Sequence, residues 1–229
     1  MAIYIGLDDT DNPESRGTGR LARQLAAELA GDFRVLSVTR HQLLVDPRVP
    51  YTSHNSSAAI RLEGEPGLDL GELFGWAKAR MMADFQPGSD PGLCVAGQVP
   101  EEITGFGRRA QSELISRVEA FALAQAHGLL LRGLGGSQDG VIGALAAVGL
   151  AACGEDGRYL QIGTIRDLNG VLPVAELLRA GIAAVQTLDG APVADGWVLV
   201  EKLRPARRGD RPVQYVAREG EYWVPVKLD

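Results

Sequence analysis

The N-terminal part of the chain alternates apolar runs with polar, turn-rich stretches. Residues 2–7 form a short apolar run that predicts a strand, and the polar stretch 8–19 follows it. Leu21, Leu25 and Leu29 then recur at the spacing of one helix face. Thr18 stands directly before this run, where a side chain that caps the helix by accepting backbone N–H bonds is expected.

The middle of the chain predicts two more strands and two longer helices. Residues 33–45 and 58–62 have the character of extended chain, and two prolines break the sequence between them, within 46–50. Helical periodicity appears in residues 69–85 and again in 108–127. Gly128 follows the second of these runs and predicts its end.

The sequence pattern changes after Gly154, and this change predicts a second domain. Before it, the apolar run 129–131 leads into the glycine-rich loop 133–140 and a small-residue helix, 141–152. After it, apolar runs are shorter, and we expect a helix with Pro173 in its first turn and three strands, at 172–180, 197–202, 213–217 and 222–227. We therefore predict an α/β protein with domains 1–155 and 156–229.

Charge and cysteine usage exclude several classes of protein. The formal net charge of −6 and a pI near 5.2 argue against a protein that coats nucleic acid, which needs a basic surface, but leave room for a local basic groove. Cys94 and Cys153 are far apart and form no CxxC pair, so neither a disulfide framework nor a structural zinc site is expected.

The location expected from the sequence is the cytoplasm. The N-terminus lacks the basic region and long apolar stretch of a signal peptide. The most apolar run, 141–153, is shorter than the ~20 residues that cross a bilayer. His41, His54 and His127 are scattered, and their spacing predicts no metal cluster.

Three carboxylates stand within four positions where the first predicted strand ends. Asp8, Asp9 and Asp11 repel one another unless cations or hydrogen-bond donors compensate. Mg²⁺ prefers hard oxygen ligands, and the carboxyl end of a strand suits the ligand crevice of an α/β sheet. The pattern favours a magnesium–phosphate site. The alternative is an Asp-rich turn whose side chains accept from local backbone donors.

The glycine-rich loop 133–140 suggests a phosphate contact. Glycines let a backbone approach a phosphate closely, and a helix N-terminus offers free N–H groups with a partial positive charge. The Gly-x4-Gly-Lys-Ser/Thr pattern of a P-loop is absent. The alternative interpretation is a flexible connection before a tightly packed core helix.

Two other polar clusters have weaker implications. Residues 50–57 are rich in hydroxyl and amide groups, which fits either a polar-ligand contact or a solvated loop. Four arginines join Lys202 near the C-terminus, and a solvated hairpin face is expected there, with phosphate contact as the alternative: Arg204, Arg207, Arg208 and Arg211. Trp197, Tyr215 and Trp223 are expected in the core of the second domain.

Four stretches, in this order, resemble the archaeal 2-agmatinylcytidine synthetase family that modifies an isoleucine tRNA. They are IGLDDTDN (5–12), DPRVPYTSHNSSAAI (46–60), DPG (90–92) and DGVIGALAAVG (139–149). The resemblance covers about the first 150 residues, and RPVQYVAREG (211–220) resembles part of the family's ferredoxin-like domain. It implies a kinase-like α/β domain, residues 1–155, that binds ATP and Mg²⁺, followed by a smaller ferredoxin-like α+β domain, residues 156–229.

The resemblance also implies roles for individual residues. Asp8, Asp9 and Asp11 would hold Mg²⁺ and the nucleotide phosphates, and Thr18 matches a family threonine that receives phosphate. The implied ATP contacts are Gly135, Gly136, Ser137, Asp139 and Gly140, and the implied substrate contacts are Tyr51, Thr52, His54 and Asn55. The family has Lys-Thr-Arg-Gly-Asn where this chain has Thr52-Ser53-His54-Asn55-Ser56, so two cations are missing.

The function predicted from the sequence is Mg·ATP-dependent phosphorylation or activation of a small molecule, nucleoside-like or an amine. The family's OB-fold and zinc ribbon, which grip tRNA, have no counterpart in the sequence. One alternative is therefore modification of a tRNA cytidine together with a partner protein. The other is a nucleotide-binding module without catalysis. The oligomeric state is not predicted.

Overall fold

The computed structural model describes residues 1–15, 17–49 and 54–228, so Tyr51 and Thr52 of the predicted substrate loop lie outside the described residues. The chain divides into two compact units, unit 1 (Met1–Cys153) and unit 2 (Gly154–Asp229). The roles that the sequence suggested for the two domains stay predictions. None of the helices in the described residues has the length and apolar character needed to cross a lipid bilayer.

Unit 1 is a mixed α/β layer structure built on an antiparallel sheet. Its strands lie in the order β5-β4-β1-β3-β2, and each adjacent pair is antiparallel. Their bounds are β1 Ala2–Asp8, β2 Arg34–Gln42, β3 Ser56–Glu63, β4 Gly92–Ala96 and β5 Leu130–Gly133. The Asp-rich loop begins where β1 ends, as expected, in a sheet whose neighbouring strands run antiparallel.

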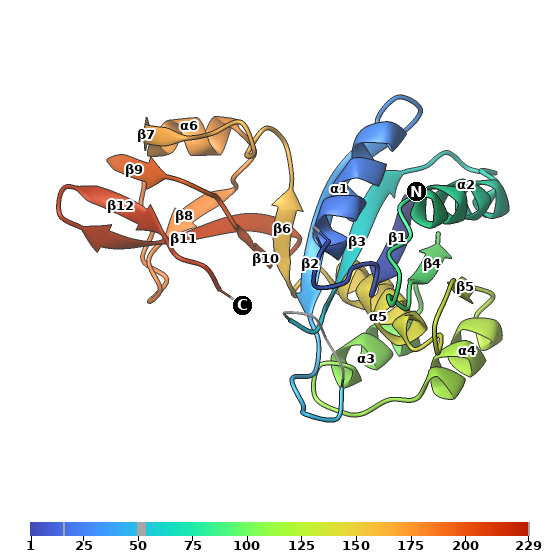
Figure 1. The fold of residues 1–229 in the computed structure, drawn as a ribbon. Coiled ribbons are helices and arrows are strands. Elements are labelled where there is room, and N and C mark those ends of the chain that lie inside the picture. Colours follow the sequence, from blue (N-terminus) through green and yellow to red (C-terminus); the bar gives the residue numbers. More distant parts are fainter. Residues whose placement is uncertain (16, 50–53, 229) are drawn as a thin grey trace. The chain divides into compact units, whose positions relative to one another are not determined.

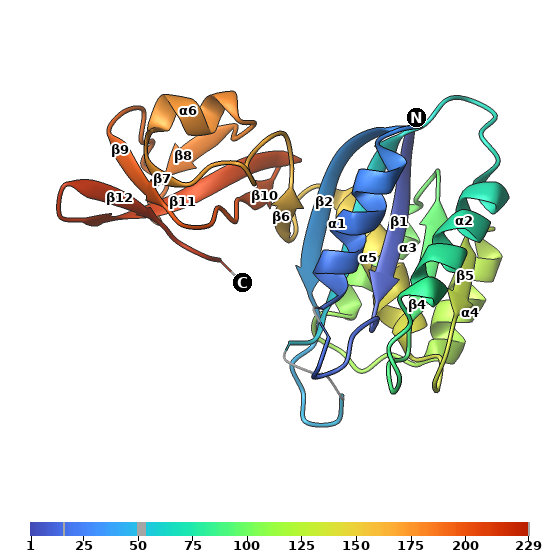
Figure 2. The same cartoon turned by 45° about the horizontal axis from the view of Figure 1, so that its top comes forward.

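In the described part of unit 1, five helices lie on the two sides of this sheet (Figures 1 and 2). Helices α1 (Thr18–Leu29) and α2 (Leu70–Ala83) lie on one face. Helix α5 (Gly140–Cys153) packs on the other face against β1, β4 and β3. Helices α3 (Glu101–Arg109) and α4 (Arg117–Ala126) pack against α5.

Glycines bring α5 unusually close to the sheet. Successive strand residues point to opposite faces, so Tyr4, Gly6 and Asp8 share the face toward α5. A Cβ at Gly6 would overlap the carbonyl oxygen of Ala144, and one at Gly92 would overlap the backbone of Gly140. The small-residue sequence of α5 is thus explained by close backbone packing, which fixes the helix N-terminus over the end of β1.

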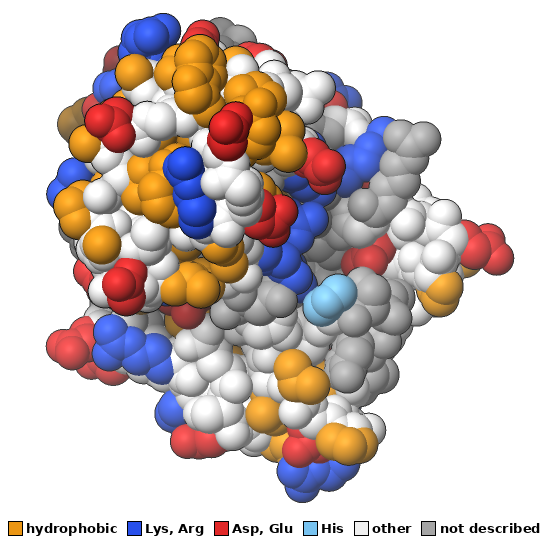
Figure 3. Space-filling view, turned by 90° about the vertical axis from the view of Figure 1, so that its left-hand side faces the viewer, with side chains coloured by type: hydrophobic (Ala, Val, Ile, Leu, Met, Phe, Trp, Pro, Cys, Tyr) orange, Lys and Arg blue, Asp and Glu red, His pale blue; other side chains and the backbone are white. Residues whose placement is uncertain are grey.

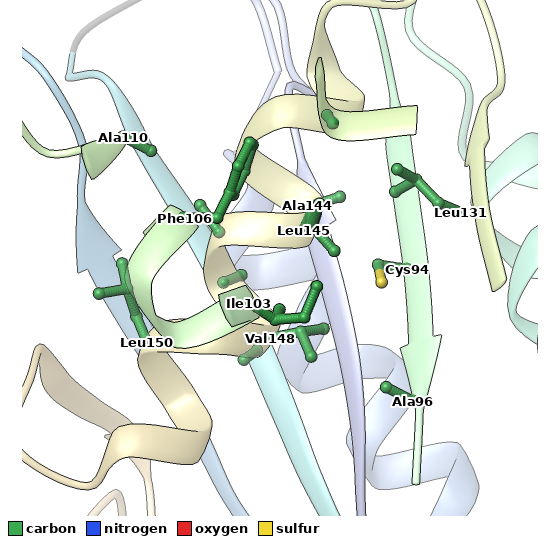
Figure 4. Packing of buried hydrophobic residues seen from close by; sticks show 14 of the residues in the cluster. Cys94, Ala96, Ile103, Phe106, Ala110, Leu131, Ala144, Leu145, Val148 and Leu150 are labelled. Atoms are coloured by element: carbon green, nitrogen blue, oxygen red, sulfur yellow. The ribbon is translucent and has the colours of Figure 1, made fainter. Parts of the chain in front are cut away.

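The core of unit 1 surrounds α5. Side chains of α5 pack with Ile103 and Phe106 of α3 and with Cys94 of β4 (Figure 4). Residues 141 and 143–151 are all buried, which fits a helix that is apolar on every side. This packing makes the α5 side of the site rigid, because the interior of a protein is as dense as an organic crystal.

Two local predictions for unit 1 are wrong. The single helix expected at 108–127 is two helices, because residues 110–116 leave the helical conformation and the Ser116 side chain accepts from the Glu119 N–H to start α4. Thr18 does not cap α1, since it is the first helical residue and Gly17, at φ 83°, takes the capping position. The helix end at Gly128 is confirmed, with φ 66° at that glycine.

Unit 2 is a mostly antiparallel sheet with one short helix. Its strand order is β6-β10-β11-β12-β9-β7, with β8 beside β11, and the β8–β11 and β9–β12 pairs are parallel. Helix α6 contributes Val174 and Leu177 to its core. The bounds are β6 Arg158–Gln161, β7 Gly170–Pro173, α6 Val174–Arg179, β8 Ala184–Gln186, β9 Trp197–Val200, β10 Ala206–Arg208, β11 Arg211–Glu219 and β12 Tyr222–Pro225.

Two side chains of unit 2 contradict the expectations. Trp197 was expected in the core but is 53% exposed. Figure 3 shows hydrophobic side chains, coloured orange, among charged ones on one face of the molecule. Arg207 was expected on a solvated hairpin but is 1% exposed, and its Nε donates to Asp210 Oδ1 at 3.0 Å. The arginine cluster is therefore not one uniform basic surface.

Candidate nucleotide site

A cavity of about 710 Å³ lies in unit 1 where β1 ends and α5 begins. This volume suits a small-molecule ligand, for which pockets of about 300–1,000 Å³ are usual. The cavity gathers residues that are far apart in the sequence, and those predicted to form the site are Asp8, Asp9, Asp11, Thr18, His54, Asn55, Gly136, Ser137, Asp139 and Gly140. Gly135 is not among the lining residues, and a Cβ there would lie 3.0 Å from Cε2 of the Phe85 ring.

The deepest carboxyl group of the cavity is Asp8, the last residue of β1. Burial, together with repulsion from Asp9, raises the pKa of Asp8 from 3.8 to about 8. A side chain at Gly143 of α5 would overlap the Asp8 carboxylate, so this glycine makes room for it. Asp8 is therefore a carboxyl group that the fold holds in a poorly hydrated place, where a cation or a proton must compensate its charge.

Asp9 follows with its backbone in the left-handed region, at φ 47°. Desolvation, together with the charges of Asp90 and Asp11, raises the pKa of Asp9 from 3.8 to about 6. The mutual repulsion expected from the sequence is thus present in the structure. It involves Asp90 as well, a residue that was not expected in the site.

Asp90 joins the Asp-rich loop to the glycine loop. Its N–H donates to the Asp9 carbonyl at 3.2 Å, and its carboxylate accepts from the N–H groups of Gln138 and Asp139, each at 2.8 Å. The Ser137 hydroxyl lies 2.7 Å from Asp90 Oδ2. Asp90 opens the Asp-Pro-Gly triplet (90–92), which carries part of the family resemblance and is the sequence signal that could have drawn attention to this residue.

Thr18 is held in a chain of hydroxyl groups at the start of α1. Its hydroxyl donates to Asp11 Oδ1 at 2.9 Å and accepts from the Thr10 hydroxyl at 3.1 Å. Thr10 and Thr18 are both buried, at 5% and 7% exposure. A hydroxyl that donates to a carboxylate is the arrangement of a nucleophile beside a base, although here it also fixes the Asp11 rotamer.

Apolar residues line the cavity from the loop between β2 and β3, from the segment between α3 and α4, and from α5. Asn55 closes this loop, since its Nδ2 donates to the Leu44 carbonyl at 2.8 Å, so this side chain supports the wall. His54 is exposed beside it and lines the cavity. The apolar lining residues are Pro13, Leu43, Leu44, Val49, Phe85, Ala110, Leu114, Ile115 and Ile142.

The acidic half of the cavity suits a hydrated cation shared with a ligand better than a closed metal cage. Among the described residues, no group of three or more His, Cys, Asp or Glu side chains is arranged to hold a metal. Mg²⁺ needs only one or two carboxylates, because water and phosphates complete its shell. No Lys or Arg appears among the lining residues that the structure describes, and Arg117 pairs with Asp139 at 3.0 Å.

Comparison with characterised proteins finds similarity to enzymes that modify tRNA. A curated relative from Pyrococcus horikoshii, the isoleucine-tRNA 2-agmatinylcytidine synthetase TiaS, is 28% identical over 153 residues, which are 65% of this chain and 36% of the relative. The TiaS of Thermococcus sibiricus is 26% identical over 65% of this chain and 35% of that protein. The curated relatives of this chain are TiaS synthetases. The resemblance seen in the sequence is thereby confirmed, and the chain spans about a third of their length.

Solved structures show the same fold. A tRNA fluorescent labeling enzyme is 24% identical with a TM-score of 0.57, and TiaS in complex with its isoleucine tRNA and ATP is 23% identical with a TM-score of 0.57. Each match covers 65% of this chain and 36% of the other. The predicted α/β class is confirmed by this likeness and by the mixed layers of unit 1. No profile of a known protein family matches the chain.

Proposed function

We propose that unit 1 binds Mg·ATP in the cavity at the end of β1 and activates an acceptor by phosphoryl transfer, and that this acceptor is a cytidine of a tRNA. The observation that carries the proposal is the single cavity that joins Asp8, Asp9 and Asp11 to the glycine loop before α5. The similarity to TiaS, which has been solved with a tRNA and ATP, supports both ATP and the tRNA acceptor.

The division of the cavity into two chemical halves fits a nucleotide. An adenine ring is apolar on its faces and suits the wall around Leu43, Leu44 and Ile142, while the phosphates belong near the carboxylates and the N-terminus of α5. Asp8, Asp9 and Asp11 would hold Mg²⁺, which neutralises phosphate charge during transfer. Gly136 and Gly140 would bring the loop backbone close to the phosphates.

Thr18 is assigned as a residue that receives a phosphoryl group. Its hydroxyl already donates to Asp11, so this carboxylate can take the proton when the oxygen attacks phosphorus. The bond to the nucleotide breaks as the bond to the Thr18 oxygen forms, and transfer of this kind depends on positioning and charge neutralisation.

A second candidate is the function first predicted from the sequence, activation of a small nucleoside-like or amine substrate. The observation that favours it is the acidic lining of the cavity together with the formal net charge of −6, both of which disfavour the approach of a polyanion. His54 and Asn55, where the family carries other residues, would then contact the acceptor. A binding module that never turns ATP over is the third possibility.

ATP consumption in the presence of different acceptors separates these functions. The proposal expects turnover that depends on an isoleucine tRNA and binding that weakens steeply as salt rises from about 50 to 200 mM, because phosphate contacts release counterions. Turnover with nucleosides or amines but not with tRNA would assign the second function. ATP binding without turnover for any acceptor would leave only the binding module.

A further inference from the structure

Asp90 lies just before β4, outside both loops that form the nucleotide site. We propose that Asp90 is a positioning residue that holds these two loops in left-handed backbone conformations and so shapes the site before ATP arrives. Its effect on ATP affinity rests on the proposed function. The loop conformations themselves are a property of the fold.

Both loops contain a residue in a conformation that L side chains rarely adopt. Among the described residues, the non-glycine residues with positive φ are Asp9 at 47°, Gln138 at 69° and Asp210 at 59°. Asp9 belongs to the Asp-rich loop and Gln138 to the glycine loop. Such conformations are costly and persist only where surrounding contacts enforce them.

Asp90 supplies a contact to each of these strained residues. Its backbone N–H donates to the carbonyl of Asp9 at 3.2 Å. Its carboxylate accepts from the N–H of Gln138 through Oδ1 and from the N–H of Asp139 through Oδ2, both at 2.8 Å. One residue therefore fixes the turn on each side of the cavity.

The glycine loop wraps around the Asp90 side chain. A Cβ at Gly136 would lie 2.9 Å from Asp90 Cγ, and one at Gly140 would overlap the Asp90 carbonyl oxygen. Two adjacent backbone donors need two acceptor oxygens in this confined space. Asparagine offers only one, and its NH₂ group would face an N–H, so Asp90→Asn is a nearly isosteric change that breaks the arrangement.

The test compares Asp90→Asn, the double variant Asp90→Asn with Gln138→Gly, and Asp32→Asn as an exposed control. Amide hydrogen exchange of residues 136–139 is measured without ligand, and the Kd for Mg·ATP by calorimetry. We expect Asp90→Asn to speed exchange and to raise the Kd about tenfold, since one strained residue loses its support. Gln138→Gly recovers the Kd in the double variant, because glycine adopts φ 69° without strain.

The outcomes separate a positioning role from a direct one. Loss of binding that Gln138→Gly does not restore means that Asp90 touches the nucleotide or its cation, which overturns the proposal. The proposal is also overturned if amide hydrogen exchange of residues 136–139 is the same in Asp90→Asn as in the wild-type protein. If the wild-type protein does not bind ATP, the proposed function fails, and the exchange rates alone decide the role of Asp90.

A further variant covers the case in which Asp90→Asn does not fold. Gln138→Gly in the wild-type background removes the strain and keeps every contact of Asp90. We expect the midpoint of its urea unfolding to rise, because glycine adopts the left-handed region without steric strain. A lower midpoint would show that Gln138 is not strained there and would overturn the proposal.

Discussion

At the scale of single residues, the site is a set of carboxylates held close together by the backbone. Asp8 ends β1 beneath α5, Asp9 turns the chain, and Asp11 accepts from Thr18. The pKa values of Asp8 and Asp9 are raised because burial and mutual repulsion disfavour the charged forms. These carboxylates therefore reduce stability when they are ionised without a cation, and their effect on folding can be measured directly.

The pH dependence of stability tests the burial of Asp8. The pKa of an ordinary Asp is 3.8, and that of Asp8 in the folded protein is about 8. Between about pH 4 and pH 8 the folded protein therefore keeps a proton that the unfolded chain has already lost. The free energy of unfolding should therefore fall as pH rises through this window in the presence of a chelator. Asp8→Asn should flatten the fall and raise stability at pH 8 by about 1–3 kcal/mol. Urea unfolding at both ends of the window measures this.

The control for that experiment is Asp32→Asn, which changes an exposed carboxylate of unit 1. It should keep the wild-type dependence on pH. A wild-type protein whose stability does not change between pH 5 and pH 8 would contradict the assignment. So would an Asp8→Asn variant that follows the wild-type curve.

The hydroxyl of Thr18 allows a second test at this scale. Incubation with Mg·ATP should add one phosphoryl group to the protein, detected by mass spectrometry of the peptide that contains Thr18. Thr18→Ala should abolish this mass, whereas Thr18→Ser keeps an oxygen beside Asp11 and should retain part of it. Phosphate found at Thr10 with Thr18 intact would reverse the two roles.

At the scale of elements, the close approach of α5 to β1 is the feature that builds the site. Gly143→Ala should displace the Asp8 carboxylate, destabilise the protein by about 1–3 kcal/mol and abolish binding of Mg·ATP. Gly105→Ala is the matched control, because Gly105 is also a helical glycine and a Cβ there meets nothing within 4 Å. It should add up to about 1 kcal/mol of stability and leave binding unchanged. Calorimetry and urea unfolding measure both effects.

The loop between β2 and β3 gives the second test of an element. Asn55→Ala removes the hydrogen bond to the Leu44 carbonyl and should cost about 1 kcal/mol of stability. Because Leu43 and Leu44 form the apolar wall, nucleotide affinity should fall about threefold to tenfold. Asn169→Ala, an exposed asparagine of unit 2, serves as the control. Equal affinities of the two variants would remove this loop from the site.

Several helices and strands of unit 1 could be predicted from the local spacing of apolar residues. The apolar runs predicted β1 and β3, the leucine spacing predicted α1, and the run of small residues predicted α5. The strand order and the break between α3 and α4 were not predicted, because both depend on contacts between distant segments. β4 was missed because its Gly-Leu-Cys-Val-Ala sequence is short, and a buried central strand shows no alternation.

The candidate site was predicted in part for a similar reason. Carboxylates crowded at a strand end are visible in the sequence, so Asp8, Asp9 and Asp11 were named. Asp90 was not, because its importance comes from Gln138 and Asp139, which lie far away in the chain and close in space. Gly143 also required the structure, since only the packing of α5 shows what a side chain would meet.

At the scale of the whole molecule, the residues that line the cavity all belong to unit 1. The net charge of −6 offers little general attraction for RNA, so a tRNA acceptor requires specific contacts beyond the cavity itself. The similarity to TiaS covers 65% of this chain, and the curated relatives are nearly three times longer than the matched region. The proposed function therefore requires first that unit 1 binds a nucleotide.

Calorimetric titration of the whole chain with ATP, with and without Mg²⁺, tests that claim most directly. We predict binding in the presence of Mg²⁺, much weaker binding with a chelator, and a loss of this difference in Asp9→Asn but not in Asp32→Asn. If no heat of binding is detected at millimolar ATP with Mg²⁺, unit 1 does not bind the nucleotide and the proposed function is contradicted. Binding that is equally strong without the cation would contradict the role given to the carboxylates.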